Sequence, residues 1–248
     1  MKKNLFDNQM NKSKKHECVL VISDLHIPYH HPQSFDFLKA IKKKYKDIDL
    51  VVNIGDELDQ HGLSFHDTDP DLSSPGDELS ISKKYIKELE KMYPEMVLLH
   101  SNHSSLIYRR ALKHGMPKAY LKSYNDFLDV GPGWEWVDDL NIKLSNGQEC
   151  FMTHGISADG LKLAMQYGKH VVQGHFHSKF NIQYFSNPDN LVWSLQVGCL
   201  TNQRSMAFNY SRQFRLRFII GCGIIINGWP RLLPMVLDHN GNWIGELV

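Results

Sequence analysis

Apolar and polar positions follow one another along the chain in blocks, and the spacing within each block predicts the element that it forms. Three continuous apolar runs are typical of strands covered on both faces, and they lie at residues 18–22, 50–54 and 96–99. Residues 32–45 carry apolar side chains at helical spacing, and Asp77 is predicted to cap a second helix. Strands that alternate with helices in this way predict βαβ units and a parallel sheet.

The pattern changes from helical to mostly β after residue 131. Helices are predicted at 106–113 and 119–128, and the runs 136–144 and 149–153 flank an Asn-Gly turn that is typical of an antiparallel hairpin. A short helix and further β-runs follow, at residues 161–167, 171–172, 182–185, 191–197, 219–226 and 232–237. We therefore expect an α/β protein with two stacked sheets in a single domain, residues 17–248, after a flexible polar leader, residues 1–16.

Charge and composition narrow the classes of function. The 248 residues contain 28 Lys and Arg against 27 Asp and Glu, a formal net charge of +1, so no global positive field is available to hold nucleic acid. No apolar run reaches the length of a membrane span, and no apolar signal segment follows the N-terminus. The four cysteines show no CxxC pairing, which argues against a disulfide framework. We expect a cytoplasmic protein without membrane contact.

Histidine is the one residue type with an unusual count, at 14, and it is the commonest metal ligand. Polar side chains follow five of the predicted strands, at Ser23-Asp24-Leu25-His26, Gly55-Asp56-Glu57-Leu58-Asp59, Ser101-Asn102-His103, Thr153-His154-Gly155 and Gly174-His175-Phe176-His177. Any one of these segments alone is more typical of a capped turn or of surface imidazoles. Their joint occurrence at strand ends, where α/β sheets hold their ligands, predicts a metal site.

The residue types restrict the metal. Imidazole together with carboxylate suits Mn, Fe, Zn, Ni or Co, and no thiolate belongs to the set. A mononuclear tetrahedral site needs only three or four protein ligands, which leaves a mononuclear metal-binding protein as the weaker interpretation. Two ions roughly 3.5–4 Å apart that share one carboxylate suit a larger set. The seven candidates favour this dinuclear site: Asp24, His26, Asp56, Asn102, His154, His175 and His177.

The order of these segments resembles that of the calcineurin-like metallophosphoesterase family, whose motifs are DxH, GDxxD, GNH, a lone His and GHxH. The resemblance covers about residues 18–180. The chain as a whole is similar to small single-domain members from bacteria and bacteriophages. The resemblance implies a four-layer α/β/β/α sandwich of two mixed β-sheets flanked by helices, with a dinuclear metal site at the strand ends. For a phage-encoded protein it implies the host cytoplasm.

The resemblance also implies a role for each residue. The first ion would be held by Asp24, His26, Asp56 and His177, and the second by Asp56, Asn102, His154 and His175, with Asp56 bridging. His103 matches the family's catalytic histidine, which protonates the leaving group, and Asp59 matches the acid that pairs with it. The expected cofactors are two divalent ions, Mn²⁺ first, with Fe, Zn, Ni, Co or Mg as alternatives. A water that bridges them would become the hydroxide that attacks a phosphoester in line.

Departures from the family pattern concern the loops that face the substrate. Ser101 replaces the glycine before Asn-His, so this loop is expected to sit differently, and Gln60 stands where some members carry a phosphate-gripping arginine. Arg109 is one candidate replacement. Arg204 is a second candidate for substrate binding, because it begins a segment up to residue 217 in which arginines and aromatics interleave.

The expected substrate is a nucleotide, which would make the chain a nucleoside monophosphate phosphatase, or a short nucleic-acid phosphoester. The near-neutral charge argues against a processive DNA nuclease. A serine/threonine protein phosphatase or a DNA exonuclease of the same family is the enzymatic alternative, and a scaffold protein on the same fold is the non-enzymatic one. The complete set of seven ligands, together with His103, favours the enzyme.

Overall fold

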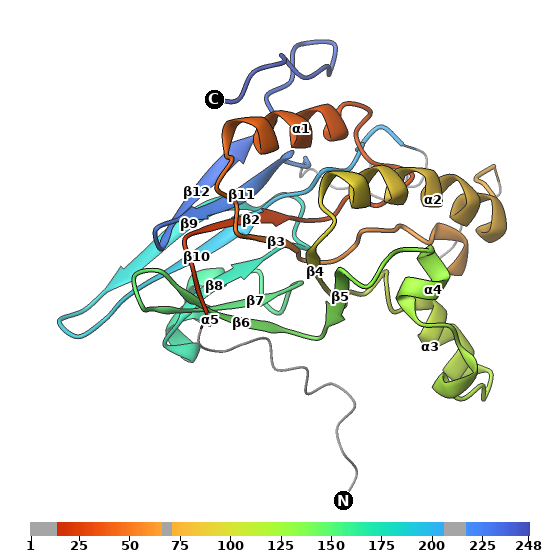
Figure 1. Cartoon of the computed structure of the whole chain (residues 1–248), viewed down its shortest axis with the longest axis horizontal. Helices are drawn as coiled ribbons and strands as arrows, with labels where there is room; N and C mark the ends of the chain where they lie inside the picture. The colour runs from red at the N-terminus through yellow and green to blue at the C-terminus, as the bar shows by residue number, and fades with distance from the viewer. Residues whose placement is uncertain (1–13, 66–70, 206–216) are drawn as a thin grey trace, which may run out of the picture.

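Two six-stranded mixed β-sheets packed on each other form the centre of the protein (Figure 1). The structure is a computed structural model that describes residues 14–65, 71–205 and 217–248. The first sheet has the strand order β12–β11–β2–β3–β4–β5, formed by Cys18–Ile22 (β2), Leu50–Asn53 (β3), Met96–Leu99 (β4), Trp134–Val137 (β5), Gly221–Ile226 (β11) and Trp229–Pro234 (β12). The second has the order β1–β6–β7–β8–β10–β9, formed by Lys15–His16 (β1), Leu140–Leu144 (β6), Glu149–Thr153 (β7), His170–Gln173 (β8), Phe180–Ser186 (β9) and Leu191–Val197 (β10).

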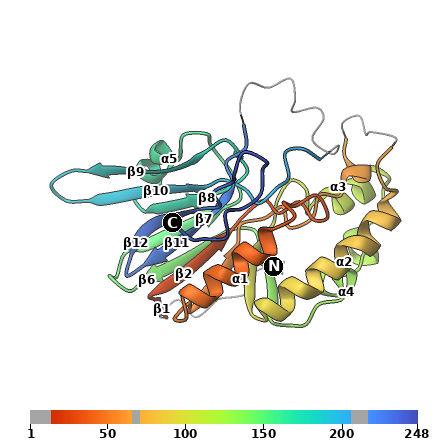
Figure 2. The same ribbon diagram turned by 90° about the horizontal axis from the view of Figure 1, so that it is seen from above.

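Helices cover the outer face of each sheet (Figures 1 and 2). Helices α1 (Ser34–Lys44) and α2 (Pro75–Met92) pack on the first sheet, and α5 (Gly160–Tyr167) packs on the second. The predicted four-layer α/β/β/α sandwich is therefore confirmed. Shorter helices lie near the carboxyl ends of the strands of the first sheet: His61–Leu63 (η1), Leu106–Lys113 (α3), Lys118–Tyr120 (η2) and Tyr124–Leu128 (α4). No helix in the described part of the chain combines the length and the apolar character that crossing a membrane takes.

Strand β2 shows why the central strands are apolar throughout. Val19 and Val21 belong to the core between the two sheets, whereas Leu20 and Ile22 belong to the core beneath α1 and α2. All four side chains are fully buried. A strand with both faces covered has no polar side, so its sequence is a continuous apolar run.

Two predicted helix boundaries are wrong. Helix α2 begins at Pro75, and its cap is Ser74, whose Oγ accepts a hydrogen bond from the Asp77 amide at 3.2 Å. Proline fits the first helical position because an N–H there would have no partner in the helix. The predicted helix 119–128 is instead η2 followed by α4, because Ser123 starts a new helix by accepting a hydrogen bond from the Asp126 amide.

Two further expectations differ from the structure at strands. The predicted strand 136–144 is two strands, since β5 pairs with β4 in the first sheet and β6 pairs with β7 in the second. The chain thus passes from one sheet to the other at residues 138–139. The predicted leader ends earlier than residue 16, because β1 pairs with β6 and His16 Nδ1 lies 2.7 Å from Asp49 Oδ1. Residues 1–13 lie outside the described residues.

Candidate metal centre

All seven predicted metal ligands lie at one end of the two sheets. Each follows the carboxyl end of β2, β3, β4, β7 or β8, and these strands run parallel within their own sheets. One hydrogen bond joins the segments across the sandwich, from the His175 amide to Asp24 Oδ2 at 3.0 Å. Another joins neighbouring segments of the second sheet, from the Gly174 amide to the His154 carbonyl at 2.9 Å. Parallel strands therefore bring residues from five distant segments together.

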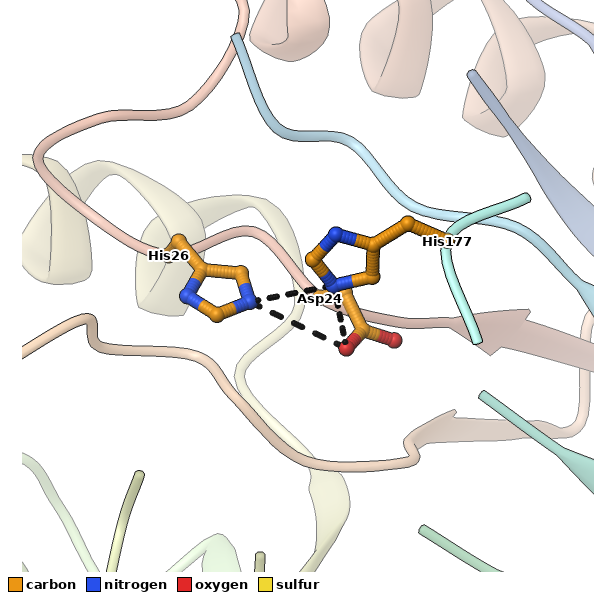
Figure 3. Close-up of side chains that lie close together, drawn as sticks. All are labelled: Asp24, His26 and His177. Carbon is orange, nitrogen blue, oxygen red and sulfur yellow. Dashed lines mark hydrogen bonds and ion pairs between the residues drawn. The ribbon is translucent and has the colours of Figure 1, made fainter. Parts of the chain in front are cut away.

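The first group of ligands consists of Asp24, His26 and His177, whose side chains point toward one another (Figure 3). His177 Nε2 lies 3.1 Å from Asp24 Oδ1 and 3.3 Å from His26 Nε2. His26 Nε2 lies 3.8 Å from the same Asp24 oxygen. Asp24 and His26 are buried, and His177 is half-buried.

The second group consists of Asp56, Asn102, His154 and His175. His154 Nε2 is at its centre, 2.7 Å from Asn102 Oδ1, 3.2 Å from His175 Nδ1 and 3.3 Å from Asp56 Oδ2. Asp56 and His154 are buried, whereas Asn102 and His175 are exposed. This group is therefore open to solvent on one side.

Asp56, a member of the second group, also lies beside the first. Its Oδ2 lies 3.5 Å from His26 Nε2 and 3.3 Å from His154 Nε2. One carboxylate oxygen thus stands between an imidazole of the first group and an imidazole of the second. This is the position of a carboxylate that bridges two ions.

Hydrogen bonds on the far side of two imidazoles fix which nitrogen faces the centre. His26 Nδ1 donates to Asp59 Oδ1 at 2.8 Å, and His154 Nδ1 donates to the Ile54 carbonyl at 2.9 Å. In the neutral form of each imidazole, with its proton on Nδ1, Nε2 presents its lone pair toward Asp56. Carboxylate and carbonyl acceptors behind a histidine are the usual way in which proteins orient a metal ligand.

The distances fit a pair of divalent ions. Ligand atoms bound to one ion at about 2.1 Å are separated by about 3.0 Å at right angles and by about 3.4 Å at tetrahedral angles. The two groups show separations of 2.7–3.8 Å between N and O atoms of the types that Mn, Fe, Zn, Ni and Co accept. The convergence of imidazole lone pairs on buried carboxylates is what a cation site requires.

The electrostatics of the centre favour positive charge. Burial disfavours an imidazolium, but the hydrogen bonds to Asp24 and Asp59 and the charge of Asp56 raise the pKa of His26 to about 10. His154 is likewise buried, and the charge of Asp56 raises its pKa to about 9. Despite burial, neighbouring histidines lower the pKa of Asp24 and of Asp56 below the usual range. The carboxylates are therefore ionised, and the potential that stabilises imidazolium also stabilises a divalent cation.

The backbone at the centre is strained. Asp24, His26, Asp56 and His175 all have left-handed backbone angles, with φ between 50° and 64°. Such angles cost a residue with a side chain on the order of 1–3 kcal/mol each, and they cluster at functional sites. They aim side chains that follow one another closely along the chain into one small volume.

Ser101, which departs from the family pattern, has a defined role beside Gly55. Its Oγ accepts hydrogen bonds from the Asp56 amide at 3.0 Å and from the Ser104 amide at 3.1 Å. Gly55 has a φ of +111°, and a Cβ there would lie 2.7 Å from Ser101 Cβ and 2.9 Å from His154 Nδ1. The hydroxyl therefore holds the backbone of Asp56, and only glycine at 55 leaves room for it.

His103 and Asp59 lie together, although their contact differs from the expected one. His103 Nδ1 donates to the backbone carbonyl of Asp59, and it is 3.7 Å from the Asp59 carboxylate, which instead accepts from His26. The His103 amide donates to Asp56 Oδ1 at 3.2 Å. The ring of His103 is thus oriented by main chain, and the carboxylate of Asp59 orients a candidate ligand.

The two candidate phosphate-gripping arginines contact other parts of the surface. The Arg109 guanidinium lies 4.9 Å from the centre of the Phe65 ring. Arg204 Nη1 donates to the Asn240 carbonyl at 2.9 Å. Most of the arginine- and aromatic-rich segment that begins at Arg204 lies outside the described residues. A role for either arginine in holding phosphate stays a prediction.

Two residues that sequence reasoning missed hold Asp24. Ser23 Oγ donates to Asp24 Oδ2, and Thr201 Oγ1 donates to the Asp24 carbonyl at 2.6 Å. Ser23 precedes the DxH motif directly, so its position was a usable signal. Thr201 is 177 residues away along the chain and carries no such signal.

Comparison with known proteins supports the resemblance. The sequence model of the family described as calcineurin-like phosphoesterase matches residues 19–198. Among solved structures, an archaeal phosphodiesterase is 17% identical with a TM-score of 0.45, over 88% of this chain and 99% of that chain. Vps29 of Chaetomium thermophilum is 13% identical with a TM-score of 0.49, over 94% and 97%. No curated protein sequence matches the chain.

Proposed function

The chain belongs to the calcineurin-like phosphoesterase family, and from this premise we propose that it hydrolyses phosphoesters with two divalent metal ions. The observation that carries the proposal is the position of Asp56 Oδ2, within 3.5 Å of His26 Nε2 and 3.3 Å of His154 Nε2. The first ion is assigned to Asp24, His26, Asp56 and His177, and the second to Asp56, Asn102, His154 and His175. Mn²⁺ is the first metal to test.

The ions would supply Lewis acidity, which neutralises the phosphoryl oxygens and lowers the pKa of a water nucleophile. The carboxylates of Asp24 and Asp56 bring the negative charge that holds them. Asp59 keeps His26 in the tautomer that presents Nε2, and the Ile54 carbonyl does the same for His154. The chain thus pre-orients its donors before a substrate arrives.

His103 is assigned as the general acid. Its Nδ1 is committed to the Asp59 carbonyl, which only accepts, so this nitrogen keeps its proton. Nε2 is therefore the atom that exchanges a proton with the substrate, and in the imidazolium form it protonates the leaving oxygen. A positioned acid of this kind contributes typically about 10²–10⁴-fold. The side chain is 20% exposed, so part of the ring is accessible.

The substrate is proposed to be a nucleotide or a short nucleic-acid phosphoester. The exposed side of the centre, at Asn102 and His175, is the side from which an ester can approach. The complete ligand set and the oriented His103 favour hydrolysis over a scaffold role.

The test is metal-reconstituted turnover. The chain is stripped with chelator, reloaded with Mn²⁺, Mg²⁺ or Ni²⁺, and analysed for metal content. It is then assayed on p-nitrophenyl phosphate, its bis-ester and nucleoside monophosphates. We expect two ions per chain and metal-dependent hydrolysis. Two bound ions without turnover on any of these esters would favour the scaffold, and one ion per chain would contradict the dinuclear assignment.

A further inference from the structure

A cationic stretch without acidic residues begins at the candidate metal centre. Residues 101–123 contain no Asp or Glu, although the whole chain has a net charge of only +1. Their five Lys and Arg residues lie on α3 and on the segment around η2, namely Arg109, Arg110, Lys113, Lys118 and Lys122. Figure 1 shows α3, in green, extending away from the two sheets. This stretch is therefore locally cationic although the whole chain is near neutral.

Three of these cations surround one exposed aromatic ring. The guanidinium carbons of Arg109 and Arg110 lie 4.9 Å and 4.3 Å from the centre of the Phe65 ring, and Lys113 Nζ lies 5.4 Å from it. Phe65 is 40% exposed. Arg110 donates to the carbonyls of Leu63 and Ser64.

Ion pairs are absent from this cluster in the described part of the chain. Arg109 and Lys113 form no ion pair with a described residue. Three like charges that converge on one ring repel one another, and an anion placed among them removes that cost. The cluster around Phe65 therefore has the chemistry of a phosphate-binding surface.

Aromatic side chains line a cavity on the same α3–η2 region. The cavity, of about 250 Å³, is walled by the rings of Tyr108, Tyr120, Tyr124 and Phe127 and by Lys122. Tyr120 is 79% exposed, and Lys118 Nζ lies 5.2 Å from the centre of the Tyr108 ring. Tyr120 is thus an exposed ring near lysines, and such a pairing is what proteins use to stack an unpaired base while holding its phosphates.

We propose that this α3 surface, defined by Arg109, Arg110, Lys113, Lys118, Tyr120 and Lys122, binds single-stranded nucleic acid. Helix α3 begins three residues after His103, and its eight residues extend about 12 Å. A strand bound along it has neighbouring phosphates at the candidate metal centre. The aromatic cavity selects a single strand, because the bases of a duplex are stacked on each other. The idea that the bound strand presents an ester to the metals rests on the proposed function. Binding of the strand to the α3 surface does not depend on it.

The test is binding of a fluorescein-labelled twelve-residue oligo(dT) to the full chain, measured by anisotropy in chelator so that no ester is cleaved. The variant Lys113→Gln/Lys118→Gln/Lys122→Gln is compared with Lys43→Gln/Lys44→Gln/Lys46→Gln. Both remove three exposed charges, the control set from α1 and the residues after it. We expect Kd to rise at least tenfold in the first variant alone. A plot of the logarithm of the binding constant against the logarithm of salt concentration should become less steep by about 2. Each phosphate contact on a single strand contributes about 0.7 to this slope, and three contacts are removed.

A second variant pair tests the stacking. Tyr120→Ala should weaken binding by roughly tenfold, whereas Tyr184→Ala, which removes a ring 48% exposed on β9, should not. Equal Kd values for the two triple variants would overturn the proposal. So would equal binding of a duplex of the same length, or competition by polyglutamate as strong as that by the oligonucleotide. Binding as expected but without hydrolysis of p-nitrophenyl phosphate, its bis-ester or any nucleoside monophosphate would overturn the proposed function and leave this surface standing.

Discussion

The two halves of the candidate metal centre differ in burial and in how firmly the chain holds them. In the inner half, Asp24 and His26 are 0% and 1% exposed, and Ser23, Thr201 and Asp59 all hydrogen-bond to one of them. In the outer half, His154 is buried, but Asn102 and His175 are exposed.

This difference separates two tasks. A cation in the inner half would interact with buried carboxylate charge at a low effective dielectric, where attraction is strong. A cation in the outer half would keep a face toward solvent, where a phosphoester can reach it. We therefore expect the inner ion to be retained during purification and the outer ion to exchange.

The largest effect is expected for Asp56→Asn, because Asp56 serves both halves. The amide lacks the charge that holds the cations, so metal content should fall from two ions per chain to fewer than one. Turnover should fall at least about a thousandfold, because metal ions contribute several kcal/mol to such reactions. Elemental analysis and hydrolysis of bis-p-nitrophenyl phosphate measure the two effects. A variant that kept the inner ion in full would show that Asp56 does not bridge.

The candidate ligands could be predicted from the sequence, but the difference in burial between the two halves could not. Asp24, Asp56 and His154 each follow an apolar run whose strand character is unambiguous, and parallel strands place such ends together. Their positions could therefore be predicted. Which ligand is buried depends on the loops that cover it, and Thr201, which holds Asp24, comes from a segment 177 residues away.

The contacts of Asp59 show the same limit at one residue. Its position in the motif predicted that Asp59 would pair with His103. In the structure the Asp59 carboxylate accepts a hydrogen bond from His26, and the Asp59 backbone carbonyl accepts one from His103. Both acceptors belong to one residue, so spacing along the chain cannot distinguish them. Distinguishing them requires the folded backbone, in which Asp59 is followed by a left-handed residue, Gln60, with a φ of 53°.

A smaller loss of turnover is expected for His103→Ala, and both halves of the centre should still bind their metal ion. His103 contacts Asp56 through its amide, which the substitution keeps. Turnover on an ester with a poor leaving group should fall about 10²–10⁴-fold. The loss should be smaller for p-nitrophenolate, which needs little protonation. Metal content measures the loading, and an equal loss on both esters would argue against a general acid at this position.

The stability of the folded chain is expected to depend on pH through Glu78, which contacts the turn that carries Asp59. Its Oε1 accepts from the His61 amide at 3.3 Å in the turn that carries Asp59. Burial first, and then the charge of Asp59, raises its pKa from 4.5 to about 7. The folded chain thus binds a proton between these values that the unfolded chain has released, so stability falls as pH rises through this window.

Glu78→Gln removes that titration and keeps an acceptor for the His61 amide. Relative to the parent, the variant should gain about 2–3 kcal/mol of unfolding free energy between pH 4.5 and pH 8. Urea unfolding of the metal-free chain at both pH values measures it. Glu88→Gln on the same helix is the control, because Glu88 is 44% exposed. A difference that did not change with pH would mean that Glu78 is ionised throughout.

The smallest effects are expected when one half is altered alone. Asn102→Ala removes an oxygen 2.7 Å from His154 Nε2 and should weaken the outer ion. Asp59→Asn alters the acceptor behind His26 and should weaken the inner ion by about 10–100-fold, the usual cost of losing an orienting partner. A calorimetric Mn²⁺ titration of the stripped chain resolves the two steps. Asn102→Ala should shift only the weaker step and Asp59→Asn only the tighter one. If both variants shifted the same step, burial would not be what separates the halves, and the two ions would bind as one unit through Asp56.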